Sequence, residues 1–159
     1  MKSAMSWFLV LFLTSVSFAG EKVNVTASAI NNRCPVCGMY VAPYADWNAS
    51  VVFADNTRLV FESSKDMFKY ILNRAKYDPA GNREIVLVLA KDYSSRENID
   101  AYKAFYVIWS DVYGPMGHEP IPFASEADAK MFMKEHRGQK ILGFEDITPG
   151  LLNSMDNPE

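Results

Sequence analysis

The sequence predicts an α+β protein in which two similar ββαβ modules, related by internal duplication, follow a signal peptide. Three observations support this fold class. An apolar segment opens the chain, strand-like and helix-like patterns then follow in the order strand, strand, helix, strand, and that order occurs twice. The 159 residues include 16 basic and 19 acidic ones without a basic stripe, so we expect no nucleic-acid partner.

Residues 1–19 are typical of a secretory signal peptide. Lys2 precedes a short apolar run, and the small residues Ser17 and Ala19 stand at positions −3 and −1 of a cleavage site. The run is short for a membrane span, so we expect cleavage and a periplasmic location, with an uncleaved N-terminal membrane anchor as the alternative. No cysteine lies near the end of the signal, so no lipid anchor is predicted. Residues 20–33 form a polar leader.

The first ββαβ module is expected over residues 34–92 and begins with the motif CPVCGM. The alternating segment ASVVFADNTRLVFES predicts two strands joined by a turn at Asp55-Asn56. A helix is expected to begin at Ser63-Ser64, with Asp66 in a capping-box-like position, and to end near Lys76. The segment EIVLVLA, rich in Val, Ile and Leu, predicts the third strand.

The second ββαβ module is expected over residues 101–147, after a linker at 93–100 and before a C-terminal tail at 148–159. The aromatic and β-branched segment AYKAFYVIWS predicts its first strand. A loop at 111–119 contains GPMGHE, and EPIPF then leads into a helix at about 126–137. The segment KILGFEDI predicts the last strand.

The two predicted helices begin with similar sequences. FESSKDMFKY and FASEADAKMF share Phe, Ser and Asp at equal offsets, 62 residues apart, which predicts an internal duplication. The two modules differ in the connection between their first two strands. The first has a tight turn, whereas the second has the long GPMGHE loop, and loops longer than a turn requires often carry binding residues.

The CxxC pair, Cys34 and Cys37, decides the functional class because the chain has two cysteines. A disulfide between them would close too small a loop to stabilise the fold much. A closed zinc site needs four ligands, and the remaining good ligands, His118 and His136, lie 18 residues apart on different predicted elements. A redox pair of the thioredoxin type would begin a helix, whereas GMYVAPYADW lacks helical periodicity.

Copper fits these residue types better than zinc. Cu(I) is a soft ion that prefers thiolate and thioether ligands and is satisfied with two or three of them. Cys37 and Met39 supply both types on one short segment, and Met116 supplies a thioether from the Pro-Met-Gly loop. His118, two residues after Met116, adds an imidazole, and Cys34 is a second thiol. These five residues are the predicted metal ligands.

CPVCGMYV followed by PYADW, and later YVIWSDVYGPMGHEPIPFASEADAKMF, resemble the NosL family of accessory copper-binding proteins in nitrous oxide reductase assembly. The resemblance implies an exported protein, not an enzyme, that carries Cu(I) to a copper enzyme through a membrane-associated maturation complex. It also implies two ββαβ modules. The family's CGM thiolate and thioether fall on Cys37 and Met39, and its Pro-Met-Gly methionine falls on Met116, whereas His118 matches no family position.

Two departures from the family pattern bear on function. Family members often carry a lipidated cysteine at the end of the signal, which this sequence lacks, and Cys34 extends the single thiolate to CxxC. We therefore expect a periplasmic Cu(I) metallochaperone that delivers copper for the maturation of nitrous oxide reductase or a related copper enzyme. The main alternative is a periplasmic thiol-disulfide redox protein. A zinc-stabilised interaction module and an enzyme like organomercurial lyase are further alternatives.

Overall fold

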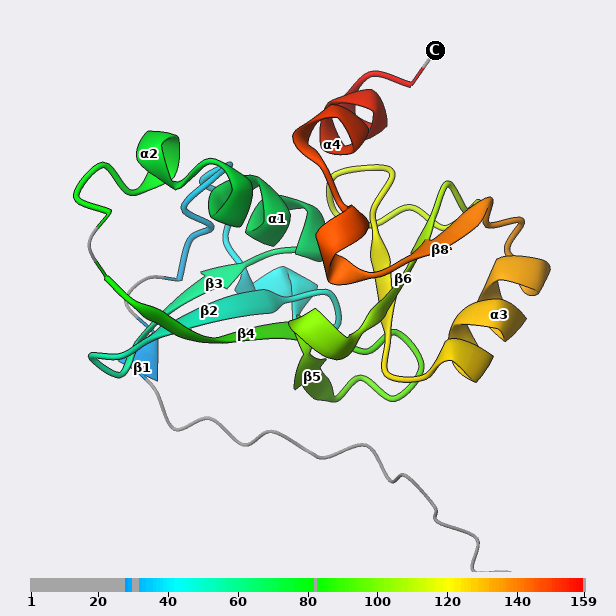
Figure 1. Cartoon of the computed structure of the whole chain (residues 1–159), viewed down its shortest axis with the longest axis horizontal. Helices are drawn as coiled ribbons and strands as arrows, with labels where there is room; N and C mark the ends of the chain where they lie inside the picture. Colours follow the sequence, from blue (N-terminus) through cyan, green and yellow to red (C-terminus); the bar gives the residue numbers. More distant parts are fainter. Residues whose placement is uncertain (1–27, 30–31, 82, 159) are drawn as a thin grey trace, which may run out of the picture.

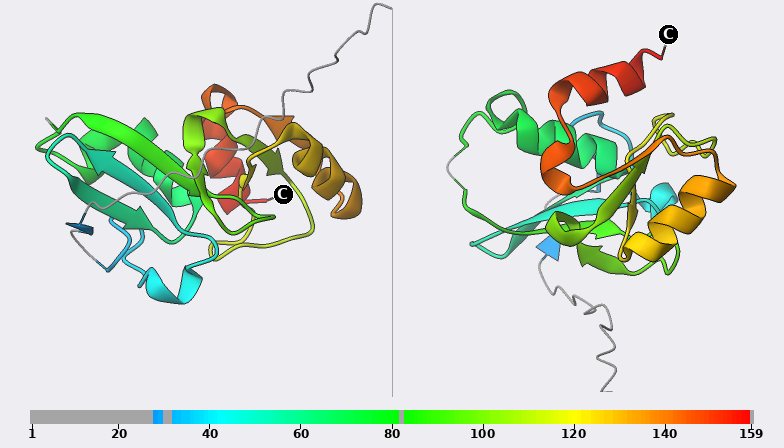
Figure 2. Two further views of the ribbon diagram at one scale, coloured as in Figure 1. Left: turned by 90° about the horizontal axis from the view of Figure 1, so that it is seen from below. Right: turned by 45° about the vertical axis from the view of Figure 1, so that its right-hand side comes forward.

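The computed structural model describes residues 28–29, 32–81 and 83–158. The expected signal peptide and most of the polar leader lie outside the described residues. Figure 1 shows two β-sheets, with α1 against the first sheet and α3 against the second, while α2 follows α1 and α4 lies near α1. Figure 2 shows the same arrangement from two further directions. The α+β fold class is thus confirmed.

Among the described residues, the first sheet has five strands in the order β1-β3-β2-β4-β5, where β1 pairs in parallel with β3 and the other pairs are antiparallel. The central strand β2 is buried throughout because it has a partner on each side and α1 packs on it. The predicted hairpin is confirmed, with its turn at Asp55-Asn56. The strands are β1 (Ser28–Ala29), β2 (Ala49–Phe53), β3 (Thr57–Phe61), β4 (Ile85–Lys91) and β5 (Asn98–Asp100).

The helix of the first module is shorter than predicted. It ends as α1 (Ser64–Leu72) because Asn73 leaves the helical conformation, and a single turn, α2 (Arg74–Tyr77), follows. Asp78 holds this region together, since its carboxylate accepts hydrogen bonds from Tyr70 and Arg74. The side chain of the N-cap residue of α1 makes no capping hydrogen bond, so the predicted capping box is wrong.

The second sheet has three antiparallel strands in the order β7-β6-β8. They are β6 (Phe105–Ile108), β7 (Ile121–Phe123) and β8 (Lys140–Leu142). Helix α3 (Glu126–Glu135) is capped by Ser125, whose hydroxyl accepts the backbone N–H of Asp128 at 3.1 Å. The start of the segment AYKAFYVIWS and the end of the segment KILGFEDI, both predicted as strand, instead form 3₁₀ turns. These are η2 (Ala101–Lys103) and η3 (Phe144–Asp146).

Both halves of the fold contain the order strand, strand, helix, strand, as β2-β3-α1-β4 and β6-β7-α3-β8 (Figure 1). In each, the first strand lies between the other two and is antiparallel to both. A common origin of the two units remains a prediction. Their interiors are continuous, because one buried cluster includes Phe61 and Phe68 of the first unit and Tyr106 and Leu142 of the second.

Two elements occur where the sequence suggested connecting segments. Strand β5 pairs with the edge of β4 inside the expected linker. Helix α4 (Pro149–Asp156) occupies most of the expected tail, with Thr148 as its N-cap and Pro149 in its first turn. Leu152 and Met155 of α4 are buried in the main core cluster. The C-terminal segment therefore belongs to the folded core and packs against α1.

Gly138→Ala is expected to lower the free energy of unfolding by about 1–3 kcal/mol. A Cβ at this position would lie 2.4 Å from Cγ1 of Val107 and 3.2 Å from the backbone of Met133. Gly150→Ala is the control, because its Cβ would meet nothing closer than Thr148 Oγ1 at 3.9 Å. Alanine in α4 should raise stability by up to about 1 kcal/mol. Equal stabilities of the two variants in chemical denaturation would contradict this prediction.

Candidate metal centre

The CPVCGM motif folds into a tight loop held by its own backbone. The N–H of Cys34 donates to the carbonyl of Met39 at 2.8 Å, and the N–H of Gly38 donates back to the carbonyl of Cys34 at 2.9 Å. Gly38 has a positive φ of 78°, a conformation that glycine adopts without strain. The loop therefore brings two residues three positions apart, Cys34 and Cys37, close together in space.

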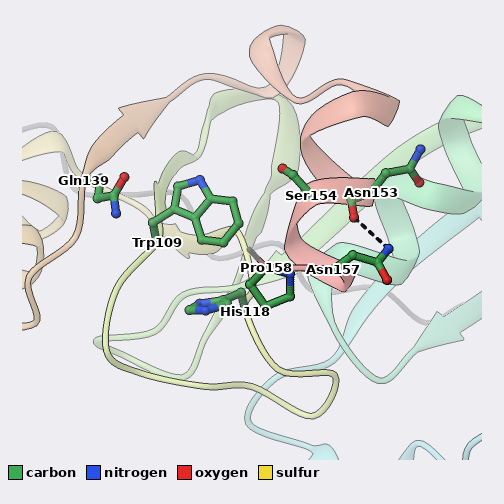
Figure 3. A pocket seen from close by; sticks show the side chains of 7 residues that line it. All are labelled: Trp109, His118, Gln139, Asn153, Ser154, Asn157 and Pro158. Atoms are coloured by element: carbon green, nitrogen blue, oxygen red, sulfur yellow. Dashed lines mark hydrogen bonds between the residues drawn. The ribbon is translucent and has the colours of Figure 1, made fainter.

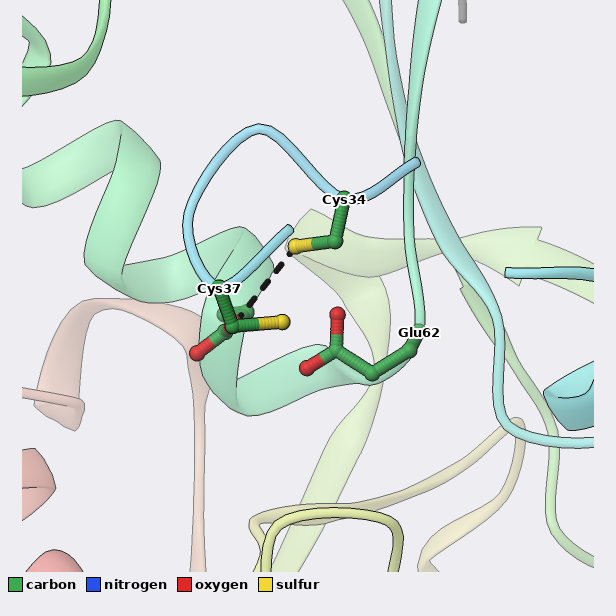
Figure 4. Close-up of side chains that lie close together, drawn as sticks. Cys34, Cys37 and Glu62 are labelled. Carbon is green, nitrogen blue, oxygen red and sulfur yellow. Dashed lines mark hydrogen bonds between the residues drawn. The ribbon is translucent and has the colours of Figure 1, made fainter. Parts of the chain in front are cut away.

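Two carboxylates approach the two thiols. One ligand atom from each of Cys34, Cys37, Glu62 and Asp66 lies within 4.8 Å of the others. Figure 4 shows the sulfurs of both cysteines and the carboxylate of Glu62 turned toward one another. The Cys34 thiol donates to Oδ2 of Asp66 at 3.4 Å. Both cysteines are free thiols, and Cys34 is buried while Cys37 lies at the surface.

The carboxylates come from the junction of β3 and α1. Glu62 follows the last residue of β3, and Asp66 lies in the first turn of α1, where the partial positive charge of a helix N-terminus favours an anion. The side chain of Ser63 donates to Oε1 of Glu62 at 3.4 Å instead of capping the helix. Asp66 faces Cys34 and also forms an ion pair with Lys69 at 3.5 Å.

The electrostatics of the cluster favour a bound cation. Burial, together with Glu62, raises the pKa of the Cys34 thiol far above its usual range, and burial also raises the pKa of Glu62. Partial burial of its sulfur and the nearby Asp66 raise the pKa of Cys37 to about 11, although the residue lies at the surface. Oε2 of Glu62 is buried and accepts no hydrogen bond from the described residues. A metal ion would neutralise this acidic cluster and displace the thiol protons.

Of the two predicted thioether ligands, Met39 lies in the cysteine loop and Met116 is tied to α1 by its backbone. Its N–H donates to Oε1 of Glu119 at 3.3 Å, and its carbonyl accepts a hydrogen bond from the ammonium of Lys65. Lys65 is the neighbour of Asp66 in the sequence, so the loop of the second module docks on the α1 turn that contributes to the thiol cluster.

Glu119 accepts hydrogen bonds from both of the segments that meet here. Its Oε2 accepts the backbone N–H of Lys65 at 3.2 Å while its Oε1 accepts that of Met116. Burial raises the pKa of Glu119 to about 8, although the charge of Lys65 acts in the opposite direction. Gly114 leaves room for this side chain, because a Cβ there would lie 2.4 Å from Cγ of Glu119. Glu119 thus bridges the two modules.

His118 does not lie in the thiol and carboxylate cluster. Its ring packs against Trp109 at a centroid distance of 4.9 Å and against Tyr113 at 4.7 Å. Its Nδ1 is buried without a hydrogen-bond partner among the described residues. Figure 3 shows that it lines a pocket of about 710 Å³ together with Trp109, Gln139, Asn153, Ser154, Asn157 and Pro158.

Sequence reasoning predicted Cys34 and Cys37, which the structure places in the cluster, but missed four charged residues around them. Lys65, Glu62, Asp66 and Glu119 are all buried, and such residues are seldom buried without partners. The sequence pattern predicts a helix-capping role for Asp66, and the GPMGHE motif includes Glu119 without indicating its partner. Their roles depend on contacts between segments that lie more than 25 residues apart, such as Lys65 and Glu119, which no local spacing reveals.

The α+β fold and the thiol and carboxylate cluster define a protein with a candidate metal-binding site. The model of the NosL family matches residues 25–152, and the chain belongs to the NosL family. The copper-binding lipoprotein NosL of Stutzerimonas stutzeri is 28% identical over 152 residues, covering 90% of this chain and 79% of that protein. The crystal structure of the copper chaperone NosL from Shewanella denitrificans shares the fold, with a TM-score of 0.64 and 24% identity, covering 80% of this chain and 99% of that one.

The match to the NosL family model confirms the family resemblance seen in the sequence. The curated relative is a lipoprotein by name. Within the part of the chain that the structure describes, no helix is long and apolar enough to cross a membrane.

Proposed function

We propose that this protein is a periplasmic Cu(I)-binding metallochaperone that delivers copper for the maturation of nitrous oxide reductase or a related copper enzyme. The cluster formed by Cys34, Cys37, Glu62 and Asp66 carries the proposal, because it gathers two soft ligands and two counter-charges on a NosL scaffold. The copper-binding and copper-chaperone names of the relatives support the choice of metal. The role is that of a carrier and not of an enzyme.

The sulfur atoms are the proposed Cu(I) ligands, because this soft ion prefers thiolates and thioethers to carboxylates. Cys37 is the central ligand, with Cys34, Met39 and Met116 as partners. Asp66 accepts the hydrogen bond of the Cys34 thiol, so its carboxylate lies beside the proposed ligand. His118 is the weakest of the predicted ligands, since its ring contacts Trp109 and Tyr113 and lies outside the cluster.

Delivery follows from the uneven burial of the two thiols. Cys34 is 2% exposed, whereas Cys37 lies at the surface, where a ligand of an acceptor protein can reach the metal. An incoming sulfur ligand would bind before the outgoing one leaves, since Cu(I) is satisfied with two or three ligands. The proposed acceptor is the copper enzyme together with its membrane-associated maturation complex. The lipoprotein name of the relative supports an exported location.

The redox alternative is not favoured by the environment of the thiols. Reactive cysteines have lowered pKa values at helix N-termini or beside cations. Here partial burial of the sulfur raises the pKa of Cys37 to about 11, and the residue precedes a glycine turn instead of a helix. At pH 7 only about 1 in 10⁴ Cys37 side chains would be the nucleophilic thiolate.

Cys37→Ala is expected to weaken Cu(I) binding at least about 100-fold, because Cu(I) with few ligands loses its most accessible thiolate. The measurement is an anaerobic titration against a chromogenic Cu(I) chelator, in which the wild type should bind one Cu(I) per monomer. Met131→Leu is the matched control, because Met131 is an exposed thioether on α3. Full Cu(I) affinity in the Cys37 variant would overturn the proposed function.

A further inference from the structure

The last residue of α4, Asp156, forms ion pairs with two lysines of α1. Its Oδ1 lies 3.1 Å from Nζ of Lys65, and its Oδ2 lies 2.7 Å from Nζ of Lys69. A carboxylate at the C-terminal end of a helix opposes the helix dipole, so α4 itself does not favour an acid there. The positive charges of Lys65 and Lys69 offset this unfavourable interaction with the helix dipole. Burial alone would raise the pKa of Asp156, but the hydrogen bonds and charges of Lys69 and Lys65 hold it below its usual range.

Each of the two lysines also contacts a residue of the candidate metal centre, and the two residues belong to different modules. Lys69 also lies 3.5 Å from Oδ1 of Asp66, which belongs to the thiol and carboxylate cluster of the first module. Lys65 donates to the carbonyl of Met116 in the loop of the second module. A continuous path of polar contacts therefore runs from Asp66 through Lys69, Asp156 and Lys65 to Met116.

Asp156 is the shared counter-ion at the middle of this path. The side chain of Lys65 is fully buried and that of Lys69 is 19% exposed, so water screens their charges poorly. Without the carboxylate, two neighbouring ammonium groups would repel each other across the first two turns of α1. We expect Lys65 then to move away from the carbonyl of Met116, and Lys69 to move toward Asp66.

We propose that Asp156 is a positioning residue for the metal centre, and that α4 acts as a latch which fixes Met116 relative to the thiol cluster. The copper part of this inference rests on the proposed function, whereas the fixing of Met116 does not. Asp156 lies outside the residues that match the family model, since that match ends at residue 152.

Asp156→Asn tests the latch, because asparagine keeps the size of the side chain and removes its charge. In the copper-free protein, hydrogen exchange at the Met116 amide should become about tenfold faster, as expected for a network of coupled residues. In the copper-loaded protein, removal of Cu(I) by an excess of chelator should also become about tenfold faster. Asp156→Glu, which restores the charge, should bring both rates back toward those of the wild type.

Glu126→Gln is the matched control. It also converts a carboxylate into an amide and breaks an ion pair, with Lys130 at 2.9 Å, but both partners are exposed on α3. Neither rate should change. Lys69→Gln distinguishes the contact of Lys69 with Asp66 from the contact of Lys65 with Met116. This variant also tests the proposal if the Asp156 variant does not fold. It should accelerate Cu(I) removal through the Asp66 branch and leave exchange at the Met116 amide unchanged.

The outcomes separate the latch from the proposed function. If exchange at the Met116 amide is the same in the wild type and in Asp156→Asn, the latch is overturned, whatever the protein binds. If exchange accelerates but the wild type holds no Cu(I), the latch stands and the copper function fails. If Asp156→Glu behaves like Asp156→Asn at both readouts, the side chain acts by its shape, and the charge argument is wrong.

Discussion

The free energy of unfolding is expected to fall by about 4 kcal/mol as the pH rises from about 5 to about 8, because Glu119 keeps its proton in the folded protein. Burial raises the pKa of Glu119 from 4.5 to about 8. Between these values the unfolded chain has released the proton and the folded protein has not. Each pH unit in this window therefore favours unfolding by about 1.4 kcal/mol.

The sign of this effect is opposite to that of an ordinary paired carboxylate. Below a pH of about 4.5 both states are protonated, so the contribution of Glu119 to stability is fully present there, and it is lost as the pH rises to about 8. The pKa of Glu62 is raised as well, so Glu62 acts in the same direction. The lowered pKa values of Asp78 and Asp156 affect stability only at lower pH.

Urea unfolding of the wild type and of Glu119→Gln at several pH values isolates the contribution of Glu119. The glutamine variant cannot titrate, so its stability should depend less steeply on pH between about 5 and 8. Its absolute stability is a poorer readout, because both oxygens of Glu119 accept backbone N–H groups and glutamine has one oxygen. Glu126→Gln, at an exposed position, should keep the wild-type slope. Identical slopes in all three proteins would contradict the prediction.

Local patterns sufficed for much of the fold. The hairpin of β2 and β3 follows from alternation around Asp55-Asn56, and α3 follows from its Ser125 cap, because both signals act within a few residues. Helix α4 has only eight residues and includes a proline and a glycine, so its stability comes mainly from burying Leu152 and Met155 in the core. Such an element cannot be recognised without its partner.

In the candidate site, too, some contacts follow from local sequence and others depend on the tertiary fold. Cys34 and Cys37 meet because one short loop contains both, and that proximity was evident from the CxxC spacing. Glu62 and Asp66 join them only after β3 and the cysteine loop are brought together in the fold. Met116 is fixed by Lys65, a residue that an amphipathic pattern would place in solvent. The sequence therefore predicts that the two cysteines lie together, whereas the charged residues around them are brought there by tertiary contacts.

Lys65→Met is expected to lower the free energy of unfolding by about 3–5 kcal/mol, because it removes one partner from a buried charge network. The Lys65 side chain is fully buried, and its ammonium contacts Asp156 and the carbonyl of Met116. Methionine fills similar space but leaves that carbonyl without its donor. Lys103→Met is the control, because Lys103 is 82% exposed in its ion pair with Asp100, and its loss should change stability by less than about 1 kcal/mol.

A double-mutant cycle decides whether charge pairing causes the loss. If Lys65 and Asp156 stabilise the fold through their pairing, then Lys65→Met combined with Asp156→Asn should be less destabilised than the sum of the single variants. The expected difference is about 0.5–3 kcal/mol, because the second change removes an anion that the first has left with one cation. Additive effects in chemical denaturation would instead show that Lys65 stabilises the protein by packing and by its hydrogen bond to Met116.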